Sequence, residues 1–325
     1  MTRNRKLYFP NLNGLRCIAA CFVIINHTEQ FKYFYGIGDG VLSPSVKNIG
    51  KLGVMLFFVL SGFLITSLLL SEERIFGTIH TKKFYIRRLL RITPLYLLLI
   101  FLVFFVIQHV SFLEIPRMRN PIEENFTTIV VLHLFFLPNL TTAIYGFLPY
   151  IAQAWSIGTE EQSYLLWPLL LKRCKKNRLI LMAGIILFYV LIRIVLKLFF
   201  LTVPHYEIIA KFWRHFNIDA IATGGIFAVL LFKKHRILKF VVHQKTFYIT
   251  LTGVSILLLS GHRSLFSLSC LFRFIWYYHY QFSSKYTLKK SAGRIDASLF
   301  RPNLIRNIYV PFYSNDFGTH VSIEI

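Results

Sequence analysis

The chain has 325 residues, a formal net charge of +23 from 37 Lys and Arg against 14 Asp and Glu, and a mean hydropathy of +0.55. Charged residues make up only 16% of it and apolar residues 55%, whereas a soluble domain carries about 25% charged residues. This composition excludes a soluble single domain, a disordered chain and a secreted disulfide scaffold. It also argues against nucleic-acid binding, because long apolar stretches interrupt the positive charge.

Apolar stretches of spanning length recur along the chain, and a helix needs about 20 such residues to cross a bilayer. We therefore expect an all-α, polytopic transmembrane helix bundle of about eight spans. The predicted spans are 12–31, 52–70, 84–112, 153–171, 179–201, 212–232, 238–260 and 262–282. Residues 127–150 are apolar but are interrupted by two prolines, an asparagine and a glycine, so we predict a re-entrant or interfacial segment there.

Basic residues between the spans are distributed asymmetrically. With a cytoplasmic N-terminus, the inner segments carry 22 Lys and Arg and the outer segments carry 8. The inner segments are 1–11, 71–91, 172–178, 233–239 and 285–294, and the outer segments are 28–51, 113–126, 202–215 and 261–263. This bias fits the positive-inside rule with an even number of spans and both ends inside.

The ends of the chain differ from the spans between them. Arg16 interrupts the first apolar run and no small-residue cleavage site follows it, so we predict a retained span rather than a signal peptide. Residues 283–325 keep no stretch of spanning length. We predict a membrane domain over 1–282 and an atypical polar tail over 283–325, which is either a cytoplasmic extension or the product of a disrupted reading frame. The four cysteines form no C-x-x-C pair and predict neither a disulfide nor a zinc site.

Arg16 and His27 lie eleven residues apart in the first predicted span. Eleven steps of about 100° bring them onto one stripe of the helix, about 16 Å apart along its axis. Ionisable side chains inside a span are costly and usually face a cavity or a partner. The alternative is that Arg16 snorkels to the inner headgroups while His27 sits at the outer interface.

Three arginines, Arg87, Arg88 and Arg91, occur in FYIRRLLRITPLY at the predicted cytoplasmic mouth of the third span. Arg88 and Arg91 are i, i+3 neighbours on one helix face. Paired guanidinium groups suit phosphate oxygens. The alternative is a topology signal, because basic residues that flank a span need no ligand.

Two adjacent carboxylates, Glu160 and Glu161, open the apolar stretch AWSIGTEEQSYLLWP. Each costs about 3 kcal/mol near the centre of a membrane, and Gln162 adds a third polar group, so we favour a functional role. The alternative places them hydrated at the outer interface, beside an aromatic belt made by Trp155 and Tyr164.

Two further positions carry polar or small side chains inside spans. In GVMLFFVLSGFLIT, Ser61 and Gly62 favour close helix packing. Asp219, in NIDAIATGG, is an acid inside the sixth predicted span, where Arg16 or an arginine of the third span would pair with it.

Five of these stretches stand in one order along the chain. They are YFPNLNGLRCIAACFVIINH with its Arg-x10-His spacing, GVMLFFVLSGFLITSLLL, FYIRRLLRITPLYL with R-x-x-R, AWSIGTEEQSYLLWPLLL with W-S-x-x-x-E-E-Q, and NIDAIATGGIFAVLL. Together they resemble the acyltransferase family 3 of integral membrane O-acyltransferases, over about residues 8–232. The chain departs from the family pattern at Asn13, Cys17, Met55, Ser163 and Asn217. Its C-terminal end is atypical or truncated.

The resemblance implies transfer of an acyl group, most often acetyl, from acetyl-CoA or another acyl-CoA to a hydroxyl of a cell-envelope or exported carbohydrate. It implies a multi-pass protein of the bacterial inner membrane whose partners are acyl-CoA, a carbohydrate or glycolipid acceptor and the bilayer, with no nucleic acid, no metal and no bound cofactor. The implied catalytic residues are His27, Arg16, Glu160 and Glu161, and the implied donor-binding residues are Arg87, Arg88 and Arg91.

Two other functions fit the same intramembrane charges. One is a transporter or flippase for a lipid-linked sugar or anionic solute, which needs no group transfer. The other is an inactive, truncated acyltransferase, which the atypical tail suggests. The combination of an Arg-His stripe, R-x-x-R and E-E-Q favours the enzyme over the transporter.

Overall fold

The structure is a computed structural model that describes residues 12–37, 44–118, 120–199 and 204–235. All of them belong to one compact unit, Phe9–Thr287. The predicted spans 238–260 and 262–282 and the predicted tail 283–325 lie outside the described residues. Within those residues the chain forms helices joined by turns, without strands, and the predicted all-α helix bundle is confirmed for this part.

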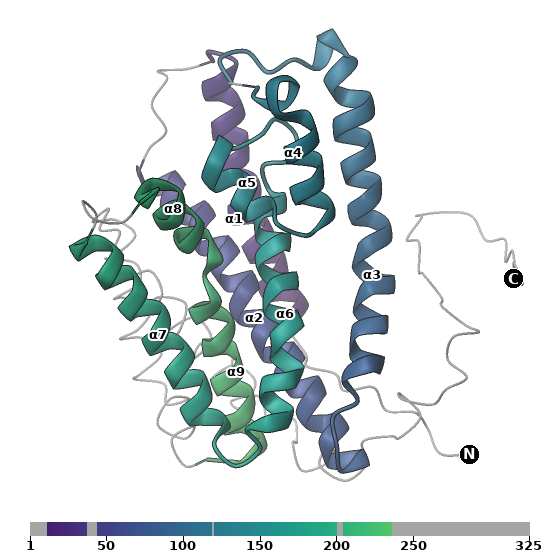
Figure 1. Cartoon of the computed structure of the whole chain (residues 1–325), viewed down its shortest axis with the longest axis vertical. Helices are drawn as coiled ribbons and strands as arrows, with labels where there is room; N and C mark the ends of the chain where they lie inside the picture. Colours follow the sequence, from purple (N-terminus) through teal and green to yellow (C-terminus); the bar gives the residue numbers. More distant parts are fainter. Residues whose placement is uncertain (1–11, 38–43, 119, 200–203, 236–325) are drawn as a thin grey trace, which may run out of the picture. The chain divides into compact units, whose positions relative to one another are not determined.

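The helices follow one another in chain order (Figure 1). They are α1 (Leu12–Phe34), α2 (Pro44–Phe76), α3 (Thr81–Phe101), α4 (Ile122–Leu134), α5 (Pro138–Tyr145), α6 (Ala154–Arg173), α7 (Arg178–Leu198), α8 (Tyr206–Phe216) and α9 (Ile218–Phe232). A π-helical turn, Leu102–Val106, and two 3-10 turns continue α3 to Leu113.

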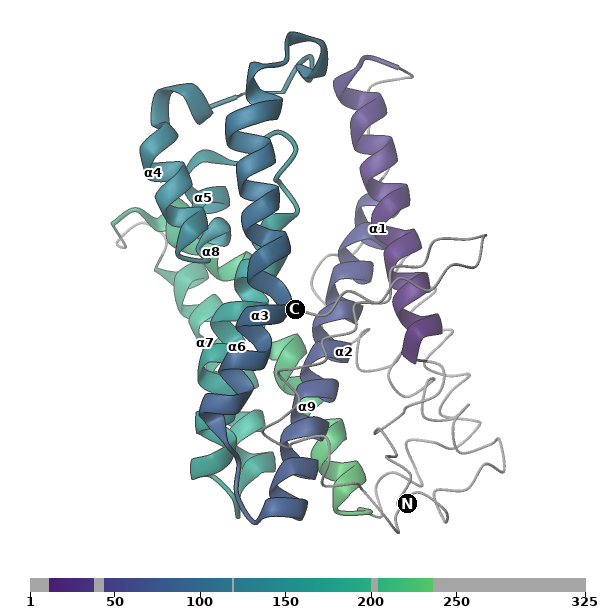
Figure 2. The ribbon, with the colours of Figure 1, turned by 90° about the vertical axis from the view of Figure 1, so that its right-hand side faces the viewer.

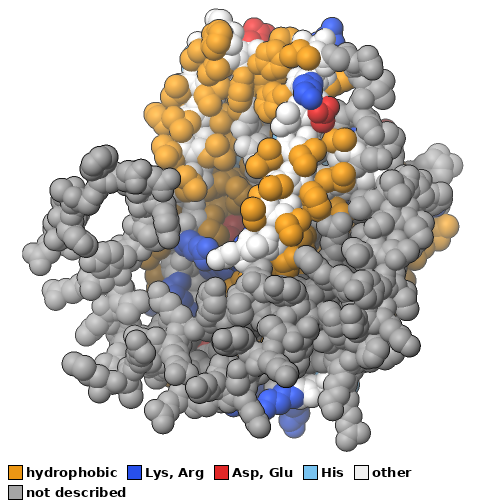
Figure 3. Space-filling view, turned by 180° about the vertical axis from the view of Figure 1, so that it is seen from behind, with side chains coloured by type: hydrophobic (Ala, Val, Ile, Leu, Met, Phe, Trp, Pro, Cys, Tyr) orange, Lys and Arg blue, Asp and Glu red, His pale blue; other side chains and the backbone are white. Residues whose placement is uncertain are grey.

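Four stretches of the described helices are long and apolar enough to cross a membrane: Val46–Phe76, Thr81–His109, Arg178–Leu198 and Tyr206–Phe232. The first and last are 72% and 67% buried by the protein, whereas the other two are only 22% and 17% buried. Helices α2 and α9 are therefore central, and α3 and α7 present apolar side chains outward. Figure 3 shows hydrophobic side chains over much of the described surface on the face seen there, as a lipid-facing surface requires.

Helix α2 packs against α9 at backbone contact. A Cβ atom on Gly62 would lie 2.0 Å from the Ile221 carbonyl oxygen, and one on Gly224 would lie 2.0 Å from the Val59 carbonyl oxygen. Only glycine fits at either position, because any side chain would overlap the opposite backbone. The predicted packing role of Gly62 is confirmed. On its other side α2 runs alongside α1 (Figure 2).

Two predicted elements differ from the observed ones. The predicted span 212–232 is divided at Asn217, which has a left-handed φ of 32° between α8 and α9. Asparagine tolerates this conformation because its side chain bonds locally, and Asn217 Nδ2 donates to the His215 carbonyl at 3.0 Å. In the predicted re-entrant segment 127–150, α4 ends and α5 forms a separate short helix that ends at Gly146, whose φ is 87°.

Segments that were predicted on one side of the membrane meet in space. Glu73 of segment 71–91 pairs with Lys175 and Arg178 of segment 172–178, and all of these belong to the predicted inner side. At the opposite end, the Arg117 guanidinium lies against Gly36, which joins two predicted outer segments. These contacts join segments that the charge pattern predicts on the same side of the membrane.

Candidate active site

Glu160 of α6 is held from two directions by hydroxyl groups. Ser61 of α2 donates from Oγ to Glu160 Oε1 at 2.8 Å, and Tyr164, one turn along α6, donates from its hydroxyl to Oε2 at 3.0 Å. Both carboxylate oxygens therefore have fixed positions between the two helices. Glu160 forms no ion pair within 4 Å with the described residues.

Arg88 of α3 lies over the ring of Tyr164, whose hydroxyl binds this carboxylate. Its guanidinium carbon lies 4.4 Å from the centroid of the Tyr164 ring and 5.9 Å from that of Phe84. A cation over an aromatic face is stabilised by about 0.5–2 kcal/mol, depending on its desolvation. Arg88 and Arg16 both interact electrostatically with the Glu160 carboxylate. One site thus gathers charges from α1, α3 and α6, with a hydroxyl from α2.

The next two residues of α6 have different surroundings. Oε1 of Glu161 is buried without a hydrogen-bond partner among the described residues, although the side chain interacts electrostatically with Arg88. Gln162 instead points to the turn between α4 and α5, where it exchanges hydrogen bonds with Asn139 at 2.8 and 2.9 Å and donates to the Phe136 carbonyl. A buried carboxylate oxygen without a donor is costly, and it is free to accept a hydrogen bond from a bound molecule.

His27 lies on α1, eleven residues from Arg16 along the chain. It is half-buried, and its Nδ1 lies 2.9 Å from Gln30 Oε1. With that amide oxygen as acceptor, Nδ1 donates its hydrogen and Nε2 keeps a lone pair able to take a proton. The helical rise places His27 about 16 Å along α1 from Arg16. The site therefore has two levels, one at the imidazole and one at Arg16 and Glu160.

The three arginines of α3 do not act as one cluster. Arg87 is paired with the buried Glu72 of α2, at 3.6 Å between Nη2 and Oε2. Arg88 covers the Tyr164 ring, and Arg91 is exposed. Among the seven predicted site residues, the structure brings Arg16, Arg88, Glu160 and Glu161 together, and it places His27, Arg87 and Arg91 in other surroundings.

Two features of the candidate site and its surroundings were not predicted from the sequence. Ser61 was assigned to packing, yet its hydroxyl binds Glu160; a serine in the middle of an apolar run was the available signal. Asp219 has a buried Oδ1 without a partner among the described residues, and the cations that interact with it are Arg193 of α7 and Lys51 of α2. These are not the arginines that the sequence suggested.

No group of three or more His, Cys, Asp or Glu side chains within the described ranges is arranged to hold a metal ion. The chemistry available at the site is that of an imidazole, carboxylates, guanidinium groups and hydroxyls. Such a set can bind an anion, orient a hydroxyl and move a proton.

Comparisons with known proteins agree with the chemistry that these side chains offer. The profile of a family described as an acyltransferase domain matches residues 9–290. A peptidoglycan O-acetyltransferase, OatA, of Listeria monocytogenes is 31% identical over 186 residues, which cover 55% of this chain and 27% of that protein. An O-acetyltransferase, OatA, of Staphylococcus aureus is 35% identical over 179 residues, which cover 53% of this chain and 27% of that protein. The chain thus matches about a quarter of the length of these relatives. No solved structure matches it.

Proposed function

The chain belongs to the acyltransferase domain family, and from this premise we propose that it is a membrane-bound O-acyltransferase that moves an acetyl or other acyl group from acyl-CoA to a hydroxyl of a cell-envelope or exported carbohydrate. The observation that carries the proposal is the Glu160 carboxylate, fixed by Ser61 and Tyr164 beside the Arg88 guanidinium. Both relatives named above are O-acetyltransferases, and the name of one specifies peptidoglycan.

In this proposal the donor enters from the cytoplasm. Arg88 and Arg91 hold the phosphates of acyl-CoA through charge-assisted hydrogen bonds, and Arg87 adds positive charge near them. Arg16 orients the extended arm of the donor and stabilises the oxyanion that forms on the thioester carbonyl. The gathering of Arg16 and Arg88 around Glu160 supports a path that runs from the arginines into the bundle.

The proposed reaction takes place at His27. Nε2 takes the proton of the acceptor hydroxyl as that oxygen attacks the thioester carbonyl carbon, which gives a tetrahedral intermediate. The carbon–sulfur bond then breaks, the electron pair leaves with the coenzyme A sulfur, and the imidazolium returns the proton to that sulfur. General-base assistance of this kind is typically worth about 10²–10⁴-fold in rate. An acyl-His intermediate is the alternative route to the same ester.

We propose that Glu160 and Glu161 bind the reactants and do not orient the His27 ring. The charge of Glu160 balances Arg16 and Arg88, and the unpartnered Oε1 of Glu161 is suited to accept a hydrogen bond from an acceptor hydroxyl. The acceptor then bridges the two levels of the site.

The proposed location is the bacterial inner membrane, with several spans and a cytoplasmic N-terminus. The excess of Lys and Arg in the predicted inner segments supports this orientation. The contact of Glu73 with Lys175 and Arg178 brings two of those segments to one end of the bundle. Residues 1–282 would form the membrane acyltransferase domain and residues 283–325 a separate polar tail.

The test is transfer of label from radiolabelled acetyl-CoA to glycan in inverted membrane vesicles. We expect His27→Ala to reduce transfer by about 10²–10⁴-fold, because the general base is lost. The matched control is His109→Ala, since His109 is an exposed histidine beyond the end of α3.

Several outcomes would contradict the proposal. Wild-type turnover in His27→Ala would remove the imidazole from the mechanism. Movement of a glycan or anion across the membrane without thioester cleavage would favour the transporter. Donor binding with no transfer at saturating acetyl-CoA would identify an inactive remnant.

A further inference from the structure

A second feature of the bundle lies outside the candidate active site. A cavity of about 240 Å³ opens between the ends of α2, α7 and α9. Its lining combines apolar and charged side chains: Leu70, Glu73, Arg74, Arg178, Val229, Phe232 and Lys233. None of these residues belongs to the proposed acyl-transfer machinery.

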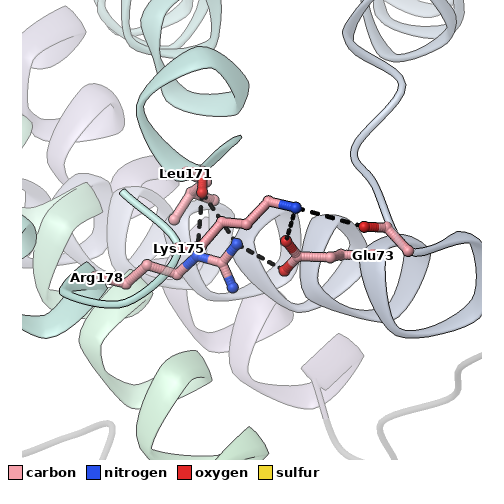
Figure 4. A network of polar contacts seen from close by, with 5 residues as sticks. Glu73, Leu171, Lys175 and Arg178 are labelled. Atoms are coloured by element: carbon pink, nitrogen blue, oxygen red, sulfur yellow. Dashed lines mark hydrogen bonds and ion pairs between the residues drawn. The ribbon is translucent and has the colours of Figure 1, made fainter. Parts of the chain in front are cut away.

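One wall of the cavity is held in place by ion pairs and hydrogen bonds around Glu73. Arg178, only 7% exposed, donates from Nε and Nη2 to the Leu171 carbonyl at 3.1 and 3.0 Å and pairs with Glu73 at 2.6 Å. Lys175 bridges Glu73 Oε1 and the Gly77 carbonyl, at 3.4 Å each. Figure 4 shows this network joining the end of α2 to the loop between α6 and α7. It fixes the shape of the cavity.

Two further cations line the cavity and differ from Arg178 in being exposed. Arg74 and Lys233 are exposed at the ends of their helices, and neither forms an ion pair within 4 Å with the described residues. The lining has three basic side chains and one acidic one, which gives a formal net charge of +2. The cavity therefore attracts an anion.

The position of the cavity along the helices identifies the kind of anion. The spanning stretches Val46–Phe76, Arg178–Leu198 and Tyr206–Phe232 all have an end within a few residues of the basic side chains. Such positions lie at the headgroup level of a bilayer. Leu70, Val229 and Phe232 supply an apolar surface beside the charges, which suits the start of an acyl chain. Basic pockets between spans at this level are typical sites for anionic lipid headgroups.

We propose that this cavity binds the phosphate of an anionic phospholipid. The phosphate lies between Arg74 and Lys233, Arg178 contributes positive potential from the wall around Glu73, and the acyl chain lies against Leu70, Val229 and Phe232. A lipid bound there holds the ends of α2, α7 and α9 together.

The experiment measures retention of lipid by the full chain, reconstituted with phosphatidylglycerol or with phosphatidylcholine. Native mass spectrometry counts bound lipid, and the thermal midpoint reports stabilisation. We expect phosphatidylglycerol to be retained and to raise the midpoint more than phosphatidylcholine. The double variant Arg74→Gln/Lys233→Gln should bind phosphatidylglycerol roughly 25-fold more weakly, since each basic residue near the surface contributes about five-fold.

The matched control is Lys172→Gln/Arg173→Gln. These two residues are exposed at the same end of the bundle, on α6, and do not line the cavity. An equal loss of lipid in this control would overturn the proposal, because general surface charge would explain the binding. Equal stabilisation by inorganic phosphate would also overturn it in favour of a soluble anion. Both double variants change only exposed side chains, so the folded yield is expected to be unchanged.

Discussion

Three Glu-Glu pairs lie on the described helices, of which Glu123 and Glu124 on α4 are exposed to solvent. The structure surrounds the other two pairs in opposite ways. Glu72 and Glu73, near the end of α2, face His80, Arg87, Lys175 and Arg178 at distances of 2.6 to 3.6 Å. Glu160 and Glu161, on α6, form no ion pair within that reach among the described residues. Glu160 is held by two hydroxyls, and one oxygen of Glu161 has no partner.

This difference is the reason for proposing a structural role for the pair on α2 and a functional role for the pair on α6. A buried carboxylate is costly unless it is paired, and the pair on α2 meets that cost with cations from three other segments. In the pair on α6, one carboxylate oxygen of Glu161 accepts no hydrogen bond from the described residues. A carboxylate left in this state does not stabilise the fold. Incomplete satisfaction is typical of positions that await a ligand. The comparison therefore supports a ligand-binding role for the α6 pair.

The largest effect on activity is expected from Glu160→Gln. Glutamine keeps the size of the side chain and an acceptor oxygen but removes the charge that faces Arg88 and Arg16. We expect acetyl transfer to fall by about 10²–10³-fold, because a preorganised charge is lost from the site, measured with labelled acetyl-CoA in vesicles. The thermal midpoint should stay near that of the wild type. Unchanged transfer would place Glu160 with the structural pair and break the comparison.

Glu73→Gln should have the opposite outcome. It leaves the buried guanidinium of Arg178 without its anion, which costs about 3 kcal/mol of stability. We expect a lower thermal midpoint with unchanged transfer per folded molecule. The double variant Glu73→Gln/Arg178→Gln should lose less than the sum of the two single variants, since the two side chains interact directly. A strictly additive result would mean that the ion pair contributes nothing.

Ser61→Ala tests whether the hydrogen bond to Glu160 contributes to the function of the candidate active site. It removes one hydrogen-bond donor to the Glu160 carboxylate. Because a hydrogen bond to a charged group contributes about 1.5 kcal/mol or more, we expect transfer to fall by roughly ten-fold. The matched control is Ser67→Ala on the same helix, because Ser67 is buried and its Oγ has no hydrogen-bond partner among the described residues. Equal effects of the two substitutions would show that Ser61 acts only through packing.

The smallest effect is expected from Arg87→Gln. Arg87 is 45% exposed and lies 3.6 Å from Glu72, which His80 also contacts at 3.0 Å. Glu72 is only 1% exposed but keeps His80 as a second partner, and solvent screens the exposed Arg87 guanidinium. The loss of stability should therefore be below about 1 kcal/mol and should shrink further at high salt. Thermal midpoints at low and high ionic strength measure it. A loss as large as that of Glu73→Gln would mean that exposure does not separate these two pairs.

The sequence predicted the secondary structure well because apolar length is a local property. Predicted span 12–31 corresponds to α1 and span 179–201 to α7, each within three residues at either end. The break at Asn217 was not predicted, because hydropathy does not register a single left-handed residue. The family resemblance was confirmed by the match over residues 9–290, and it rested on short motifs in a fixed order.

The candidate site was only partly predictable. Arg16, Glu160 and Glu161 were identified because charges inside apolar runs are conspicuous. Their relation to Ser61 and Arg88 was not, because these contacts join residues up to 99 positions apart in the chain. Arg178 entered only a count of basic residues and Glu73 was not singled out, although they form the closest ion pair between different helices among the described residues.

By itself, the sequence determined that the chain enters a membrane as a helix bundle, which family it belongs to, and which charged residues are costly enough to require an explanation. Each of these follows from composition and local order, which act within one helix. The tertiary structure alone decided that the Glu-Glu pair on α2 meets cations from other helices, whereas the pair on α6 forms no ion pair with the described residues. The surroundings of a carboxylate are supplied by other helices, and their approach depends on packing such as the glycine contact between α2 and α9.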